Sequence, residues 1–179
     1  ILVTLFTNGT LITPRIADLL VEYRPRSIEI TLYGATPETY EKVTQVEGSF
    51  ARCMQGIQLL LERKLPLNLK SVLITTNLHE LEQMKNLAKE LGVKYRYDSL
   101  IWPRLDGCKE PQSFQVPIEQ MVEMDFSEPD RRQEWERVAG MFFNQNVRSE
   151  YVYSCGAGLR SFHIDSFGKM SICTMVRRP

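Results

Sequence analysis

The sequence predicts an α/β fold with a parallel sheet, and three observations support this. Apolar runs rich in β-branched residues alternate with amphipathic stretches over the first 100 residues. No hairpin signal joins one apolar run to the next. Each run is followed by small, polar or turn-forming residues, as strands followed by turns are. Alternating strands and helices need right-handed crossovers, so the sheet is either doubly wound or rolled into a barrel.

The apolar runs read as strands buried on both faces of a sheet. We expect these strands at residues 1–6, 27–33, 67–75 and 93–100. The stretches between them have apolar residues at helical spacing. We expect helices at residues 14–24, 37–43, 49–64 and 77–91.

Several of these helices have recognisable start signals. Pro14 and Pro37 suit the first helical position, and Thr36 suits the N-cap before Pro37. Asn77 is followed three residues later by Glu80, which resembles a capping box with Asn in the cap role. The last helix is therefore expected to begin with a reciprocal bond between these two residues.

The pattern changes after Trp102. Residues 103–117 contain three prolines and predict a loop, and residues 118–143 predict an acidic, amphipathic helix broken near Pro129. Residues 160–173 predict a β-hairpin that turns at Gly168. We therefore divide the chain into residues 1–102, a linker at 103–150, and a third part at 151–179.

Composition argues against two classes of partner. The 22 basic and 22 acidic residues cancel, which disfavours binding to nucleic acid or to an anionic membrane. No apolar run approaches the roughly 20 residues of a membrane helix, so we expect a cytoplasmic protein. The chain begins without Met and ends at Pro179, and we expect it to be an excerpt of a longer protein.

In parallel α/β sheets and barrels the active groups follow the carboxyl ends of the strands. The residues found there are small, polar or flexible and suit hydrogen bonding to a polar ligand rather than proton transfer. The alternative is that they only form turns and caps. The candidate site residues at these strand ends are Asn8, Gly9, Thr31, Gly34 and Asn77.

Cys155 and Cys173 bracket the expected hairpin. Two thiolates placed in this way could converge on one soft metal or on one edge of a cluster. Two ligands are too few for structural zinc or a [4Fe-4S] cluster, so either further ligands lie elsewhere or these are ordinary buried cysteines.

The remaining reactive side chains favour structural roles. Cys53 lies on the apolar face of its expected helix, Cys108 is expected on the surface, His79 faces solvent, and His163 is expected to be a structural histidine. Lys70 lies inside the third strand, where an uncompensated ammonium is costly. It either pairs with a carboxylate such as Glu29 or faces the active mouth, where a Schiff-base role is the alternative.

Three segments resemble a known enzyme family. Residues 7–12 (TNGTLI) and 28–40 (IEITLYGATPETY) resemble the third and fourth strand regions of radical S-adenosylmethionine (radical SAM) enzymes. Cys155, followed after twelve residues by Gly168 and after four more by Cys173, resembles the opening of the SPASM extension carried by some of them. Together these segments span nearly the whole chain.

The resemblance implies a partial (β/α)6 TIM-like barrel holding strands three to six, followed by the start of an auxiliary iron-sulfur domain. It places Asn8 and Gly9 at the SAM-facing mouth and makes Thr31, Gly34 and Asn77 SAM-binding residues. It also makes Cys155 and Cys173 ligands of an auxiliary [4Fe-4S] cluster.

The implied reaction is reductive cleavage of SAM by a reduced cluster, giving a 5'-deoxyadenosyl radical that abstracts hydrogen from a substrate. The implied partners are a peptide or protein substrate and a reductant such as ferredoxin or flavodoxin. The CxxxCxxC motif that binds the catalytic cluster is absent from these 179 residues, so its ligands are expected outside the chain. Tyr33 also departs from the family, where many members have Asp.

The residues leave two other functions open. An aldolase-like barrel would use Lys70 to form a Schiff base and would not depend on iron. A non-catalytic module would hold structural zinc on Cys155 and Cys173.

Overall fold

The computed structural model describes residues 2–143 and 156–174. The chain divides into two compact units, one extending to Val122 and the other starting at Glu123. The boundary falls within helix α5 (Ile118–Ser127). Cys155 lies outside the described residues, so its predicted role as a cluster ligand has no structural counterpart here.

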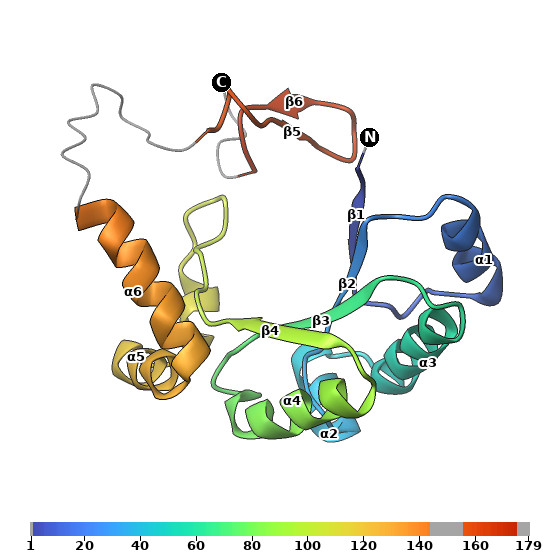
Figure 1. Cartoon of the computed structure of the whole chain (residues 1–179), viewed down its shortest axis with the longest axis horizontal. Coiled ribbons are helices and arrows are strands. Elements are labelled where there is room, and N and C mark those ends of the chain that lie inside the picture. Colours follow the sequence, from blue (N-terminus) through green and yellow to red (C-terminus); the bar gives the residue numbers. More distant parts are fainter. Residues whose placement is uncertain (1, 144–155, 175–179) are drawn as a thin grey trace. The chain divides into compact units, whose positions relative to one another are not determined.

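The first unit is built on a four-stranded parallel sheet within residues 2–122, which confirms the predicted α/β class (Figure 1). The strands lie side by side in chain order, whereas a doubly wound sheet reverses its strand order at a switch point. Sequential strand order is typical of a barrel wall. The strands are β1 (Thr4–Thr7), β2 (Ser27–Thr31), β3 (Leu67–Val72) and β4 (Lys94–Asp98).

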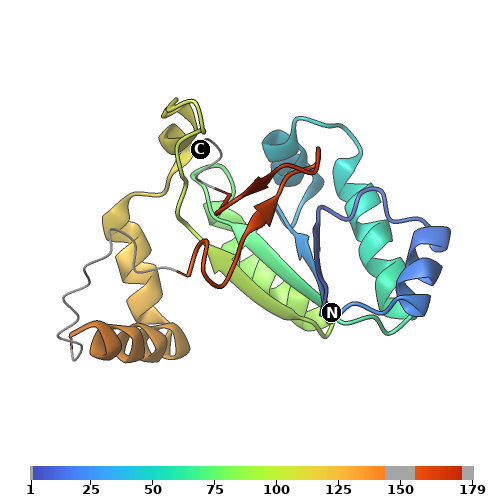
Figure 2. The ribbon, with the colours of Figure 1, turned by 90° about the horizontal axis from the view of Figure 1, so that it is seen from above.

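The helices that connect these strands cover one face of the sheet (Figures 1 and 2). Alternate strand residues such as Ile28, Ile30 and Leu69 point to this face and are completely buried. Cys53 is buried with them, as predicted. The helices are α1 (Pro14–Glu22), α2 (Pro37–Thr44), α3 (Ser49–Glu62) and α4 (Leu81–Glu90), the last preceded by the 3₁₀ turn η1 (Leu78–Glu80).

Two helix starts follow the predicted local signals. The Thr36 hydroxyl accepts a hydrogen bond from Thr39 N at 3.3 Å, and Pro37 occupies the first turn of α2. Thr13 caps α1 in the same way through Ile16 N.

The proline-rich loop returns to the sheet. Residue Gln115 forms an antiparallel bridge with Ile74, just after β3, and Thr75 N donates to Phe114 O at 2.9 Å. The following Val116 is almost completely buried. The stretch expected to be only a loop therefore contains the short 3₁₀ helix η2 (Glu110–Phe114) and is anchored in the first unit.

The second unit contains the rest of α5, helix α6 (Pro129–Phe143) and a hairpin. The predicted helix break near Pro129 is confirmed, and Asp125 before the break binds Arg131 Nε and Trp135 Nε1, both at 2.8 Å. In the hairpin, β5 (His163–Ile164) pairs antiparallel with β6 (Met170–Ser171). Within the described residues, no helix is long and apolar enough to cross a membrane.

Candidate functional site

The carboxyl edge of the sheet brings together the loops that follow β1, β2 and β3. After β1, Asn8 Oδ1 accepts hydrogen bonds from Thr10 N at 3.2 Å and Thr10 Oγ1 at 3.0 Å. The next residue, Gly9, has φ +76°, a conformation that favours glycine. Asn8 is exposed, and its Nδ2 has no hydrogen-bond partner within the part of the chain that the structure describes.

Helix α3 packs closely against this turn. A Cβ atom built on Gly56 would lie 2.2 Å from Gly9 O and 3.2 Å from Ile12 Cβ. Only glycine therefore lets the helix approach the turn so closely. Sequence reasoning did not assign Gly56 a role, although a glycine inside a helical pattern was the available signal.

Thr31 is the last residue of β2 and is half-buried. Its register partner is Lys70 of β3, so both side chains lie on the sheet face opposite the helices. The Thr31 hydroxyl has no hydrogen-bond partner among residues 2–143 and 156–174. It is therefore available to a ligand at this edge.

Asn77 and Gly34 hold the edge together. Asn77 is completely buried, and its Nδ2 donates to Tyr33 O at 3.0 Å and to Val72 O at 3.1 Å, which ties the end of β2 to the end of β3. A Cβ on Gly34 would lie 2.7 Å from Tyr40 N. Both amide hydrogens of Asn77 are thus used inside the protein.

The predicted capping box is wrong. Asn77 makes no side-chain cap bond, and its Oδ1 instead accepts from Ile74 N at 2.9 Å. The Glu80 carboxylate turns away from its own helix toward the loop after β2. The physical reason is burial: a carboxylate that is 4% exposed needs strong donors, and the backbone N–H groups of Ala35 and Thr36 provide them.

Four donors surround Glu80. Its Oε2 accepts from Ala35 N at 2.6 Å and Thr36 N at 3.2 Å, while its Oε1 accepts from the hydroxyls of Thr36 and Thr39, each at 2.6 Å. Burial alone would raise the pKa of Glu80, but these hydrogen bonds outweigh it and keep the pKa below its usual value. Neighbouring His79 has a side chain that is 65% exposed, as predicted.

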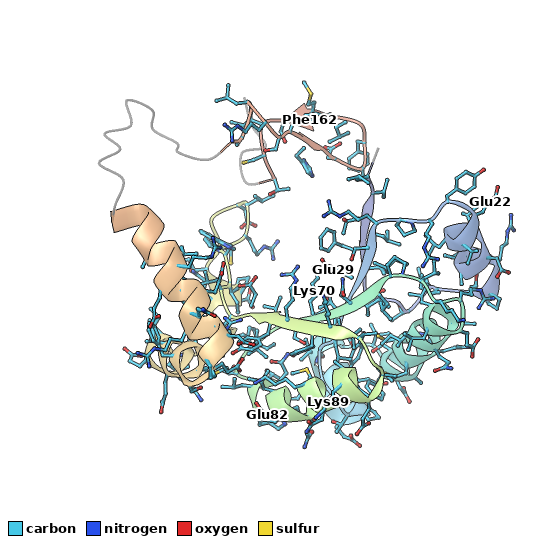
Figure 3. The ribbon with its side chains drawn as sticks, viewed as in Figure 1. Glu22, Glu29, Lys70, Glu82, Lys89 and Phe162 are labelled. Atoms are coloured by element: carbon cyan, nitrogen blue, oxygen red, sulfur yellow. The ribbon has the colours of Figure 1, made fainter. Side chains whose placement is uncertain are left out.

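The sheet face opposite the helices carries charged side chains, among them Glu29 and Lys70 (Figure 3). The alternative in which Glu29 pairs with Lys70 is not formed, because Glu29 binds Arg96 of β4 at 2.6 Å. The Lys70 ammonium lies 4.1 Å from the centre of the Phe6 ring. Burial, and then the Arg96 charge, lower the pKa of Lys70, against opposing contributions from Glu29 and Asp98.

A cavity of about 350 Å³ is lined by residues of the loops after β1 and β2 and, for the larger part, by residues of α2, of α3 and of the connection between these helices. Of the predicted site residues Asn8 lines it, together with Tyr33, the residue that departs from the family pattern. The rings of Tyr33 and Tyr40 meet edge to face at 5.5 Å along its wall.

Of the two cysteines predicted to bind a cluster, Cys173 lies within the described residues and Cys155 does not. Cys173 is half-buried. Within the described ranges no group of three His, Cys, Asp or Glu side chains could hold a metal ion. His163 Nδ1 lies 3.3 Å from Ser171 Oγ, which confirms that it has a structural hydrogen bond.

Residues 1–91, which include every candidate of the first unit, match the model of the Radical SAM superfamily. The chain belongs to this superfamily. Radical SAM relatives include the AdoMet-dependent heme synthase of Methanosarcina barkeri and the PqqA peptide cyclase of Ruegeria pomeroyi. Each is 34% identical over 90 residues, which is 50% of this chain and 26% and 24% of those proteins, respectively.

The antilisterial bacteriocin subtilosin biosynthesis protein AlbA of Bacillus subtilis is 25% identical over 186 residues, an alignment that covers 97% of this chain. The chain spans 38% of AlbA and about a quarter of the other two relatives. A solved structure, native anSMEcpe with bound AdoMet, aligns with 56% of this chain and 29% of its own, at 20% identity and a TM-score of 0.46.

Proposed function

We propose that this chain is part of a radical SAM/SPASM oxidoreductase that acts in peptide or protein modification. The observation that carries the proposal is that the family match over residues 1–91 includes an edge where polar side-chain atoms have no hydrogen-bond partner among the described residues. The printed names of two relatives, a peptide cyclase and a bacteriocin biosynthesis protein, support the substrate class. In this proposal the four strands are strands three to six of a (β/α)6 barrel.

The residues at the edge fit SAM, which carries amino, carboxylate and hydroxyl groups that need hydrogen-bond partners. Asn8 Nδ2 and Thr31 Oγ1 have free capacity and would bind it, and Gly9 would let the backbone approach. Asn77 would keep the loop ends in place rather than donate to SAM, because both of its amide hydrogens are already bonded within the protein. Gly34 would serve the packing of the same loop. When bound with a reduced [4Fe-4S] cluster, the cofactor supplies a 5'-deoxyadenosyl radical for hydrogen abstraction.

The rest of the proposal concerns groups outside the described site. The ligands of the catalytic cluster would belong to the parent polypeptide outside this chain. Cys155 and Cys173 would contribute to an auxiliary [4Fe-4S] cluster in a domain that begins near residue 151. The reductant would be a cytoplasmic ferredoxin or flavodoxin.

Membership of the radical SAM superfamily favours this function over the other two that the sequence left open. Lys70 has a lowered pKa, as an aldolase-type lysine would, but the same shift follows from its burial and then from the neighbouring Arg96 charge. Borohydride trapping of a carbonyl compound on Lys70 would revive that alternative.

The test uses the full-length parent protein, reconstituted anaerobically with iron and sulfide. Wild-type protein is expected to bind SAM and to release 5'-deoxyadenosine on reduction. Thr31→Val should weaken SAM binding by about 5- to 150-fold, because a buried hydrogen-bond partner is left unpaired. Thr4→Val is the matched control, since Thr4 lies on an equivalent face at the opposite end of the sheet.

The two results can be separated. Absence of 5'-deoxyadenosine from well-reconstituted wild-type protein would overturn the proposed function. Wild-type affinity in Thr31→Val would remove only this contact from it.

A further inference from the structure

Glu80 stands out among the buried residues because it is a charged side chain that does not reach the proposed cofactor-facing atoms. It belongs to η1, after β3, yet all four of its side-chain hydrogen-bond donors come from residues 35–39, after β2. The two groups are separated by more than 40 positions in the sequence. The carboxylate therefore joins two loops that the chain itself does not connect.

The loop that receives Glu80 leads from the end of β2 into α2. Thr36 is the N-cap of α2, so its hydroxyl accepts from Thr39 N while it donates to Glu80. A carboxylate at this position also meets the positive end of the α2 dipole. Glu80 consequently fixes the start of α2 and the backbone immediately before it.

Asn77 acts on the same loop from the other end. It bonds Tyr33 O, two residues after Thr31, whereas Glu80 bonds Ala35 N and Thr36 N. The residues between these anchors include Gly34, where space is so limited that a Cβ would lie 2.7 Å from Tyr40 N. The segment 33–36 is thus fastened at both ends and cannot shift without breaking buried hydrogen bonds.

We propose that Glu80 is a positioning residue for the cofactor site: by fastening segment 33–36 it sets the place of Thr31 and the end of β2. The inference rests on the proposed function, because it assumes that SAM binds at this edge. Glu80 makes no contact with the cofactor in this arrangement. Its removal should therefore weaken SAM binding through the loop.

The experiment compares Glu80→Gln with Glu82→Gln in the full-length, cluster-loaded protein. Glu82 lies two residues further on, its side chain is 76% exposed, and it pairs with Lys85 on the surface (Figure 3). SAM dissociation constants, thermal midpoints and hydrogen exchange of residues 33–40 are measured for each. Glu80→Gln should raise the SAM dissociation constant at least about tenfold and speed exchange in residues 33–40, because charge-assisted bonds are lost. Glu82→Gln should change neither.

A second, milder variant keeps the proposal testable if Glu80→Gln does not fold. Thr39→Val removes one of the four donors and keeps the side-chain shape, so it should fold and weaken SAM binding by about threefold. If Glu80→Gln does not fold, this variant decides the question.

The possible outcomes separate a failure of this inference from a failure of the proposed function. Wild-type protein that does not bind SAM would refute the proposed function, and the inference with it. Wild-type protein that binds SAM, alongside folded Glu80→Gln or Thr39→Val with unchanged affinity, would refute the inference alone. A lower thermal midpoint without a change in affinity would make Glu80 merely structural.

Discussion

The contact between α3 and the turn after β1 offers a sharp test of how the cofactor-facing edge is built. In Gly56→Ala the new Cβ would lie 2.2 Å from Gly9 O, so the two atoms must separate by at least 0.8 Å to reach the 3.0 Å below which such contacts essentially do not occur. The obstructing atom belongs to the backbone and cannot rotate away. The whole turn, including Asn8, must move.

Two opposing effects determine how much Gly56→Ala changes the free energy of unfolding. Alanine improves helix propensity by about 1 kcal/mol, while overpacking a tight site costs about 1 to 3 kcal/mol. Because the clash is with backbone, we expect the upper end of that range and a net loss of about 1 to 2 kcal/mol. SAM binding should weaken as well, since the turn that carries Asn8 is displaced.

Gly140→Ala is the matched control. Gly140 also lies inside a helix, α6, but a Cβ there would meet no atom within 4 Å among the described residues, apart from its chain neighbours and its own helix backbone. This change should leave stability unaltered or raise it by up to about 1 kcal/mol. Urea unfolding followed by circular dichroism, with parallel SAM titrations, compares the two variants. If Gly56→Ala is as stable as Gly140→Ala and binds SAM normally, the close approach does not exist in solution.

Two further predictions concern the charged sheet face and the cysteines. The pKa of Lys70 is lowered in the folded state, so between the lowered pKa and 10.5 the unfolded chain binds more protons and the free energy of unfolding should rise with pH. Lys70→Met should remove this rise. Equal slopes of unfolding free energy against pH in the wild type and in Lys70→Met would contradict the shift. In the reconstituted parent protein, Cys155→Ala and Cys173→Ala should each lower the iron content by about one cluster while the catalytic cluster stays visible spectroscopically. Unchanged iron in both variants would remove these residues from the ligand set.

The sequence was sufficient where local signals decide the structure. The strand–helix alternation predicted a parallel sheet, and the Thr36–Pro37 pair predicted where α2 begins. In both cases the residues that carry the signal are the residues that form the element. The break near Pro129 was predictable for the same reason.

Predictions failed where a distant partner competes with a local one. Asn77 and Glu80 have the spacing of a capping box, but their partners lie in the loop after β2, and burial of the carboxylate favours those partners. The Glu29–Lys70 alternative failed because Glu29 binds Arg96 of β4 instead. Arg96 is opposite Lys70 in the sheet, and only the folded sheet brings its guanidinium to Glu29.

The strand order described above also bears on how the chain acquires its structure during synthesis. Each strand pairs with the one made immediately before it, so the sheet can grow one unit at a time as the polypeptide emerges from the ribosome. The loop after β2 is an exception, because Asn77 and Glu80 are made about 40 residues later. Until β3 and η1 have been added, that loop lacks its anchors, and the edge with Thr31 is completed late in the folding of the first unit.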